Sequence, residues 1–160
     1  MNDDTAPALV RRLLQEHRSL LPALERWVQG LPSSTPAQSY ARLHDLARRL
    51  RRHAALEEVT LFAAMAEIAG RQALAGYEQQ HDDIDELLEQ LLPETGQLPD
   101  DATGLADRLY WICESHFEIE EKHIFRDACA RLDARTWASL WRQAESFDRQ
   151  LDEQGEGAAR

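Results

Sequence analysis

Six polar residues stand where hydrophobic side chains are expected along four amphipathic segments of the chain. Each segment carries a histidine on its apolar stripe, and two of the segments add a glutamate four residues later. Residues four apart share one face of a helix, so each such pair would point into the same interior. Buried carboxylates are rare unless they are paired or bound to a metal. The candidate metal ligands are His17, His53, Glu57, His81, His116 and Glu120.

The spacing of these residues indicates an internal repeat of two helical hairpins. His17 and His81 are 64 positions apart, whereas His53 and His116 are 63 positions apart. The strings HAALEEVTLF at 53–62 and HFEIEEKHIF at 116–125 both read His-x-x-x-Glu-Glu-x-x-apolar-Phe. Each half therefore carries one histidine followed by a His-x-x-x-Glu pair.

Four long helices must position these side chains. The chain is rich in Ala, Leu, Glu and Arg and poor in β-branched residues, and its hydrophobic residues recur at three–four spacing. We predict helices over about 7–29, 36–68, 71–92 and 102–131, and a shorter helix over about 134–152, separated by Gly- and Pro-containing turns. This pattern predicts an all-α fold, an up-down-up-down four-helix bundle with a short additional C-terminal helix.

The positions of the turns predict that the polar residues meet. Two positions of an antiparallel hairpin lie level when the turn is midway between them. The midpoint of 17 and 53 is 35, inside the first turn, and the midpoint of 55 and 81 is 68, beside Gly70. The midpoint of 81 and 116 falls at Pro99. We therefore expect all four helices to deliver their polar residues to one level of the bundle interior.

Length and charge limit the class of protein. The 160 residues predict a single domain over 1–153, with a bundle core over about 7–131 and a disordered tail over 154–160. A net charge of −11 argues against nucleic acid and anionic membranes as partners. No apolar run approaches the roughly 20 residues of a membrane span, and no signal core is present. Two cysteines too far apart on one helix for a disulfide favour a cytoplasmic location.

The donor set determines which metals are expected. Four imidazoles and two carboxylates without a thiolate suit iron, manganese or zinc. One glutamate from each half could bridge two metals. Two six-coordinate metals have about twelve positions, of which the histidines, two bridging glutamates and a bridging oxo or hydroxo group would fill about ten. Open positions would take a small ligand such as dioxygen, peroxide or nitric oxide.

The motif His17, His53-x-x-x-Glu57, His81, His116-x-x-x-Glu120, over about residues 10–130, resembles the hemerythrin-like or HHE cation-binding domains. The resemblance implies a centre of two non-haem irons bridged by Glu57 and Glu120. Members of the family are associated with oxygen binding or sensing, iron homeostasis and defence against nitric oxide or oxidative stress. The resemblance therefore implies a protein that binds or senses a small ligand.

The chain departs from the oxygen-carrying hemerythrins at three points. Their fifth histidine, four residues after the third-helix histidine, is replaced by Asp85. Their fourth-helix carboxylate lies five residues after its histidine, where this chain has Glu121. The usual proline after the phenylalanine is also missing, because Ala63 and Arg126 follow Phe62 and Phe125. The missing histidine weakens the case for reversible oxygen carriage.

Further polar residues near the motif could join the site. We expect Asp85 on a solvated helix face, His123 in the core or hydrogen-bonded to a ligand, and His44 on the surface. Glu58 and Glu121 are expected to form salt bridges or to contact the ligands rather than the metal.

Several functions are compatible with this pattern. The first is a di-iron protein that binds or senses a small molecule, and the alternative is a di-iron enzyme that reduces nitric oxide or peroxide or oxidises iron(II). A ferritin-like site would need Glu-x-x-His in two helices, but Thr60 occupies the position after Glu57 that matches His123. A metal-free interaction module would leave six buried polar groups unexplained.

Overall fold

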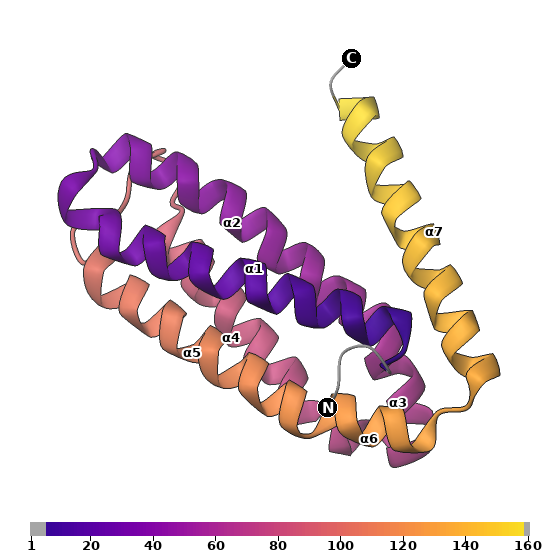
Figure 1. Ribbon diagram of the computed structural model, residues 1–160. Coiled ribbons are helices and arrows are strands. Elements are labelled where there is room, and N and C mark those ends of the chain that lie inside the picture. The colour runs from indigo at the N-terminus through magenta and orange to yellow at the C-terminus, as the bar shows by residue number, and fades with distance from the viewer. Residues whose placement is uncertain (1–5, 159–160) are drawn as a thin grey trace.

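The protein is an all-helical bundle in the computed structural model, which describes residues 6–158 and the side chains of residues 6–153. Four long helices lie side by side in Figure 1: α1 (Ala8–Gly30), α2 (Pro36–Glu57), α4 (Ala75–Leu91) and α5 (Ala102–Lys122). A π-helical turn, η3 (Glu58–Phe62), joins α2 to α3 (Ala63–Ala69). Helix α5 is followed by α6 (Ile124–Arg131) and α7 (Ala134–Ala158).

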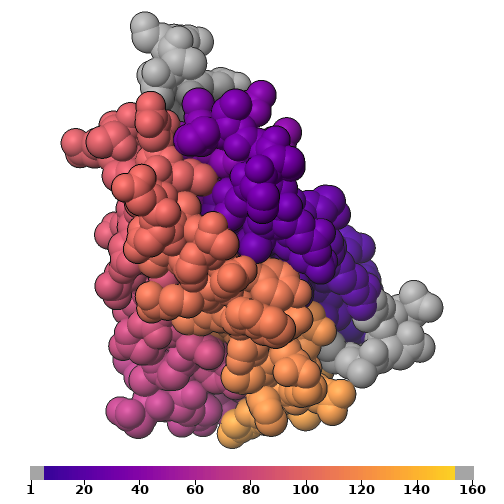
Figure 2. Space-filling model, turned by 90° about the vertical axis from the view of Figure 1, so that its left-hand side faces the viewer, coloured from indigo at the N-terminus to yellow at the C-terminus, as the bar shows by residue number. Residues whose placement is uncertain are grey.

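The four long helices form a closed ring of neighbours. Helix α1 packs against α2 and α5, and α4 packs against the same two helices. Figure 2 shows α5 crossing one face of the molecule between α1 and α4. The predicted all-α bundle with an additional C-terminal helix is confirmed. None of the described helices is both long and apolar enough to cross a bilayer.

Local sequence explains where the helices begin and end. Thr35 caps α2. Its hydroxyl accepts a hydrogen bond from the backbone N–H of Gln38, and the side-chain carbonyl of Gln38 accepts one from the backbone N–H of Thr35. Pro36 then occupies the first turn, where no backbone donor is needed. Gly70 ends α3 with a φ of 83°, a conformation that side chains disfavour. A short 3-10 turn, η2 (Leu31–Ser33), and another, η4 (Arg71–Ala73), complete the connections.

Both predicted helices become irregular just after their site glutamates. The first stays helical without a break over 36–69, as expected, but the expectation of one continuous helix over 102–131 was wrong. In the first, the π-helical turn begins at Glu58, and the Thr60 hydroxyl donates to the carbonyl of Leu56 at 2.5 Å. In the second, His123 separates α5 from α6 with φ −117° and ψ −78°. The two irregularities begin one residue after Glu57 and three residues after Glu120, and only the second interrupts the helix.

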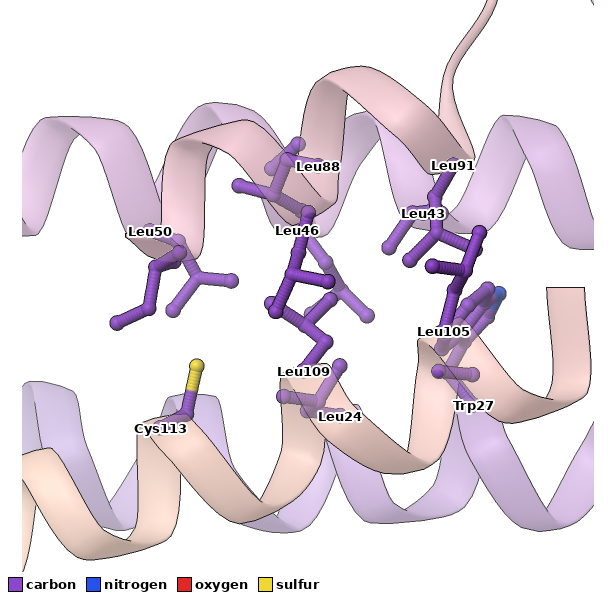
Figure 3. Close-up of a cluster of buried hydrophobic side chains, with 14 of the residues drawn as sticks. Leu24, Trp27, Leu43, Leu46, Leu50, Leu88, Leu91, Leu105, Leu109 and Cys113 are labelled. Carbon is purple, nitrogen blue, oxygen red and sulfur yellow. The ribbon is translucent and has the colours of Figure 1, made fainter. Parts of the chain in front are cut away.

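The hydrophobic core is divided into two clusters along the bundle axis. The first lies toward the turn between α1 and α2, where leucines of all four helices interdigitate with Trp27 and Cys113 (Figure 3). The second lies toward α3 and α6 and includes Leu13, Phe62 and Phe125. Site histidines and glutamates lie on the helices between residues of these two clusters, so packed apolar layers exclude water from both ends of the polar level.

Helix α7 covers the second cluster and then departs from the bundle. Leu140 and Ala144 of α7 are buried in the second cluster, and Trp137, Trp141 and Phe147 are partly buried around them. Figure 1 shows α7 starting beside α6 and slanting away toward its C-terminal end. It extends to Ala158, past the expected end near 152. Residues 159–160 and the side chains of 154–158 lie outside the described set, so the disordered tail stays a prediction, as does the domain division.

Candidate metal centre

The six residues singled out by the sequence meet at one level of the bundle interior. His17 comes from α1, His53 and Glu57 from α2, His81 from α4, and His116 and Glu120 from α5. All six are buried, and both glutamates are completely inaccessible. Their ligand atoms form two overlapping groups, each with its atoms within 4.8 Å of one another. One group holds His17 and His53, the other holds His81 and His116, and both contain Glu57 and Glu120.

Each glutamate faces histidines of both groups. The Glu57 carboxylate lies 3.4 Å from His53 Nε2 and 3.5 Å from His81 Nε2. The Glu120 carboxylate lies 3.3 Å from His17 Nε2 and 3.2 Å from His116 Nε2. Glu120 uses a different oxygen for each group. One oxygen of Glu57 makes both of its contacts, and the other lies 3.9 Å from His17 Nε2. Both carboxylates therefore face both groups, as a bridging carboxylate must.

The outer nitrogen of every site histidine is held by an acceptor on another helix. His17 Nδ1 donates to Glu121 at 2.9 Å, and His81 Nδ1 donates to Glu58 at 2.8 Å. The same contact is made by His53 to Glu16 at 2.8 Å and by His116 to Gln80 at 3.1 Å. A proton on Nδ1 leaves the Nε2 lone pair directed at the centre, which is the tautomer that a metal-binding histidine needs.

These contacts follow the internal repeat, and sequence reasoning found only half of them. Glu58 and Glu121 were expected to contact the ligands, and this prediction is confirmed. Glu16 and Gln80 were missed, although each directly precedes the first histidine of its half. The sequence could have identified these two residues, because they occupy equivalent positions in the two halves of the repeat.

Phenylalanine rings pack on the first histidine of each half. Phe62 stacks on His81 with centroids 5.4 Å apart, and its repeat equivalent Phe125 stacks on His17 at 5.5 Å. Phe62 is the last residue of the π-helical turn, and Phe125 follows the break at His123. Phe117 adds a second ring to His17, at 4.0 Å and nearly parallel. The rings fix the planes of the histidines and keep water from them.

The remaining candidates lie outside both groups. Asp85 forms an ion pair with Arg51 and is partly exposed. His123 is exposed at the break between α5 and α6, so its expected place in the core or against a ligand was wrong, because the break turns it to the surface. His44 is exposed, as predicted. Cys113 packs among leucines, and burial raises the pKa of its thiol to about 12, which keeps it from serving as a thiolate.

Buried polar atoms without a hydrogen-bond partner indicate whether the interior at the six site residues suits a cation. Within the described part of the chain, buried atoms that lack a hydrogen-bond partner are both carboxylate oxygens of Glu57 and of Glu120, His81 Nε2 and His116 Nε2. Buried polar atoms are normally satisfied, because leaving one unpaired costs the full desolvation penalty. All six belong to the two groups and face the same centre. A metal cation would satisfy every one of them, so the residues fit a metal site.

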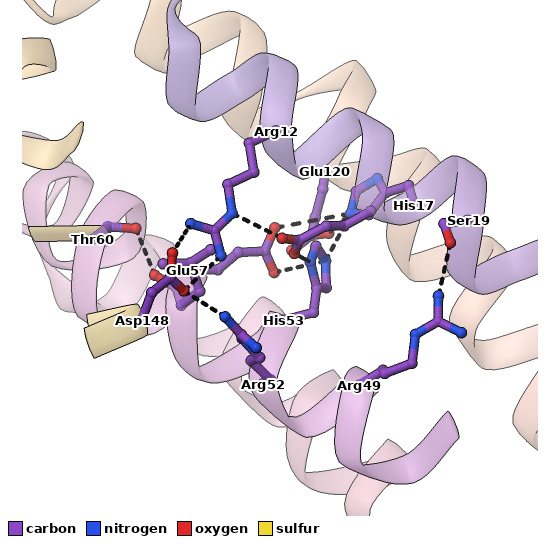
Figure 4. Close-up of polar contacts among 12 residues, drawn as sticks. Arg12, His17, Ser19, Arg49, Arg52, His53, Glu57, Thr60, Glu120 and Asp148 are labelled. Atoms are coloured by element: carbon purple, nitrogen blue, oxygen red, sulfur yellow. Dashed lines mark hydrogen bonds and ion pairs between the residues drawn. The ribbon is translucent and has the colours of Figure 1, made fainter. Parts of the chain in front are cut away.

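Helix α7 is connected to this site by a chain of polar contacts (Figure 4). Asp148 accepts two bonds from the Arg12 guanidinium, at 2.7 and 3.0 Å, and one from Arg52. Arg12 also donates to Glu16, which holds His53. The C-terminal helix thus supports the carboxylate that orients one of the site histidines.

Protonation at the centre reflects burial and close charges. Burial and the negative charge of Glu57 raise the pKa of Glu120 well above its usual range. Burial opposes ionisation of Glu57 as well, but the surrounding histidines outweigh it and lower its pKa to about 2. Burial and the nearby His81 lower the pKa of His116 to about 3. The pKa values of His17 and His81 are raised, because contacts to glutamates outweigh their burial.

Metal binding is therefore expected to release protons. Groups with raised pKa values, which are His17, His81 and Glu120, hold protons that a cation must displace. A fall in pH strengthens this competition, so metal affinity should decrease from about pH 8 to pH 6. Calorimetric titration in two buffers of different ionisation enthalpy measures the release directly. Heats that are identical in both buffers would contradict the expected proton release.

The fold and the site together define a class: four-helix bundle proteins with a buried histidine and carboxylate site for metal cations. A family model, the hemerythrin HHE cation binding domain, matches residues 8–128 of this chain. The chain belongs to that family. Helix α7 lies beyond the matched residues. No curated protein and no solved structure matched the chain in the same comparisons.

Proposed function

We propose that the chain holds two non-haem irons at this level and uses them to bind or sense a small ligand, such as dioxygen, nitric oxide or peroxide. One observation carries the proposal: two groups of four ligand atoms share both buried carboxylates. Glu57 and Glu120 would bridge the two metals, while His17 and His53 would hold one and His81 and His116 the other. Such a ligand set leaves positions free for an external molecule. We place this activity in iron, oxidative or nitrosative stress handling.

Iron suits the site for chemical reasons. A nitrogen and oxygen donor set accommodates iron, manganese and zinc, but only a redox metal gives a small diatomic ligand a chemical response. Each Nδ1 contact to a carboxylate or amide oxygen makes the facing Nε2 a stronger donor. Cys113 and Cys129 form no disulfide, which agrees with a reducing, cytoplasmic setting.

Metal analysis with an optical spectrum of aerobically purified protein tests the proposal. Two irons per chain and oxo-bridge charge-transfer bands in the near ultraviolet are expected. Replacement of the exposed His44 by alanine should leave both unchanged, whereas replacement of His81 by alanine should reduce the iron content. Two zinc or two manganese ions at full occupancy, with no iron, would reject iron as the resident metal while keeping the site.

The ligand count also supports a second candidate, an enzyme that reduces nitric oxide or peroxide or oxidises iron(II). Four histidines and two glutamates supply fewer bonds than two six-coordinate metals accept. Stopped-flow measurements with and without an added reductase separate the two candidates. Repeated turnover would establish the enzyme, and stoichiometric binding alone would establish the binder or sensor.

A further inference from the structure

The internal repeat places equivalent grooves on opposite sides of the centre. One lies between α2 and α4 beside His81, and the other lies between α1 and α5 beside His17. Matched lining positions include His81 and His17, Glu58 and Glu121, and Ala54 and Phe117. The two sides therefore serve as controls for each other within one molecule.

The groove beside His17 is the larger, at about 610 Å³, but the Phe117 ring limits it to one site histidine. The groove beside the repeat equivalent of Phe117, Ala54, reaches three site histidines. Beside His17, the groove touches no other site histidine, because the Phe117 ring covers His17 at 4.0 Å. Beside His81, the groove deepens into a cavity of about 240 Å³ that reaches His53, His81 and His116. We call this space the α2–α4 cavity. Its volume exceeds that of an apolar cavity of about 150 Å³ known to hold benzene or xenon.

The cavity also leads to the half of the centre with unpaired nitrogens. His81 Nε2 and His116 Nε2 are buried without a hydrogen-bond partner. His17 Nε2 and His53 Nε2, in contrast, lie 3.0 Å from each other. The open space therefore borders two nitrogens that are buried without a partner.

The walls and the mouth of the cavity indicate what kind of molecule it accepts. Its inner walls are apolar and include Leu50, Ile84, Leu88 and Phe117. Its charged residues are one guanidinium, Arg51, against the three carboxylates of Glu58, Asp82 and Asp85. Arg51 is paired with Asp85, so the field at the mouth is negative. A negative mouth repels anions, whereas apolar walls accept neutral molecules.

On the basis of the proposed metal centre, we propose that the α2–α4 cavity is the entry and holding site for a small neutral ligand, and that Ala54 directs this ligand to the His81 and His116 half. Neutral dioxygen and nitric oxide fit this chemistry. Anions such as azide or nitrite do not. The Arg51–Asp85 ion pair lies among the lining residues.

Xenon tests the cavity without reference to iron. Crystals of the protein as isolated, whatever metal it holds, are pressurised with xenon, and density is expected in the α2–α4 cavity. In Ala54→Phe, which copies the opposite groove, this density should be lost. Absence of xenon from the wild-type cavity would overturn the proposal even if two irons are bound. Because this readout does not depend on the metal, it separates a failure of the cavity from a failure of the metal centre.

Association kinetics of the reduced, iron-loaded protein test the route. Nitric oxide should bind Ala54→Phe at least about tenfold more slowly than wild type, and Ala54→Leu, which inserts less bulk, should fall between them. The matched control is Leu21→Phe, which adds bulk to the groove beside His17 and should change the rate less than about twofold. Equal iron content in all four proteins is measured first. Slow binding in Leu21→Phe with normal binding in Ala54→Phe would place entry beside His17 and overturn the proposal.

Salt dependence tests the charge selection. Azide binding to the oxidised protein should accelerate as ionic strength rises, because salt screens the repulsion at the mouth. Nitric oxide binding should not depend on ionic strength. An azide rate that falls with salt would indicate an attractive mouth and would overturn the selection for neutral ligands.

Discussion

Replacing Glu120 with alanine is expected to empty the centre of metal rather than merely to slow its chemistry. Its two carboxylate oxygens face both histidine pairs, so one substitution removes a ligand from each proposed metal. Loss of a group that only hydrogen-bonds to a metal ligand typically reduces metal affinity about 10–100-fold. Loss of a ligand shared by both metals should therefore reduce the affinity more than about 100-fold. Glu57→Ala should behave in the same way. Metal content per chain after gel filtration provides the measurement.

Glu118→Ala is the matched control for this substitution. Glu118 lies two positions before Glu120 on the same helix, but it is exposed and pairs with Lys122. It should retain the full metal content and the wild-type spectrum. Two metals per chain in either Glu120→Ala or Glu57→Ala would remove these carboxylates from the bridging role.

Removal of the metal is expected to lower the melting temperature by about 8–16 °C. A cation present at about 1,000 times its dissociation constant adds about 4 kcal/mol of stability by linkage. For a chain of this size, each kcal/mol corresponds to about 2–4 °C. Without the cation, four carboxylate oxygens and two histidine nitrogens lie buried without partners between two apolar clusters. Thermal unfolding before and after chelation, with the loss of metal confirmed, measures the difference.

Glu120→Ala provides the control for chelation. If it binds no metal, the chelator should not change its melting temperature. Equal melting temperatures for the metal-loaded and chelated wild type would show that the centre does not stabilise the fold.

Much of the site follows from the sequence because helix geometry is regular. A histidine and a glutamate four residues apart must share a face, and the rise per residue is constant. Turn positions near 35, 68 and 99 therefore bring His17, His53, His81 and His116 to one level. The structure groups these histidines with Glu57 and Glu120. The four long helices of the bundle and the apolar layers on both sides of this level follow from the same periodicity.

Tertiary structure alone decided which residues surround the six. Contacts such as His53 to Glu16 and His116 to Gln80 join different helices, and their distances depend on helix rotation, which periodicity does not specify. The π-helical turn and the break at His123 depend on local backbone geometry, and the break turns His123 to the surface. Packing also places Asp85 in an ion pair with Arg51, outside the metal site.

The same distinction explains the asymmetry of the centre. In the sequence, Ala54 and Phe117 are one difference among many between the two halves of the repeat. Only packing shows that the Phe117 ring covers His17 while the space beside Ala54 remains open as far as His116. A repeat in sequence determines equivalent positions, but the volume of the side chains at those positions determines which half of the centre a ligand can reach.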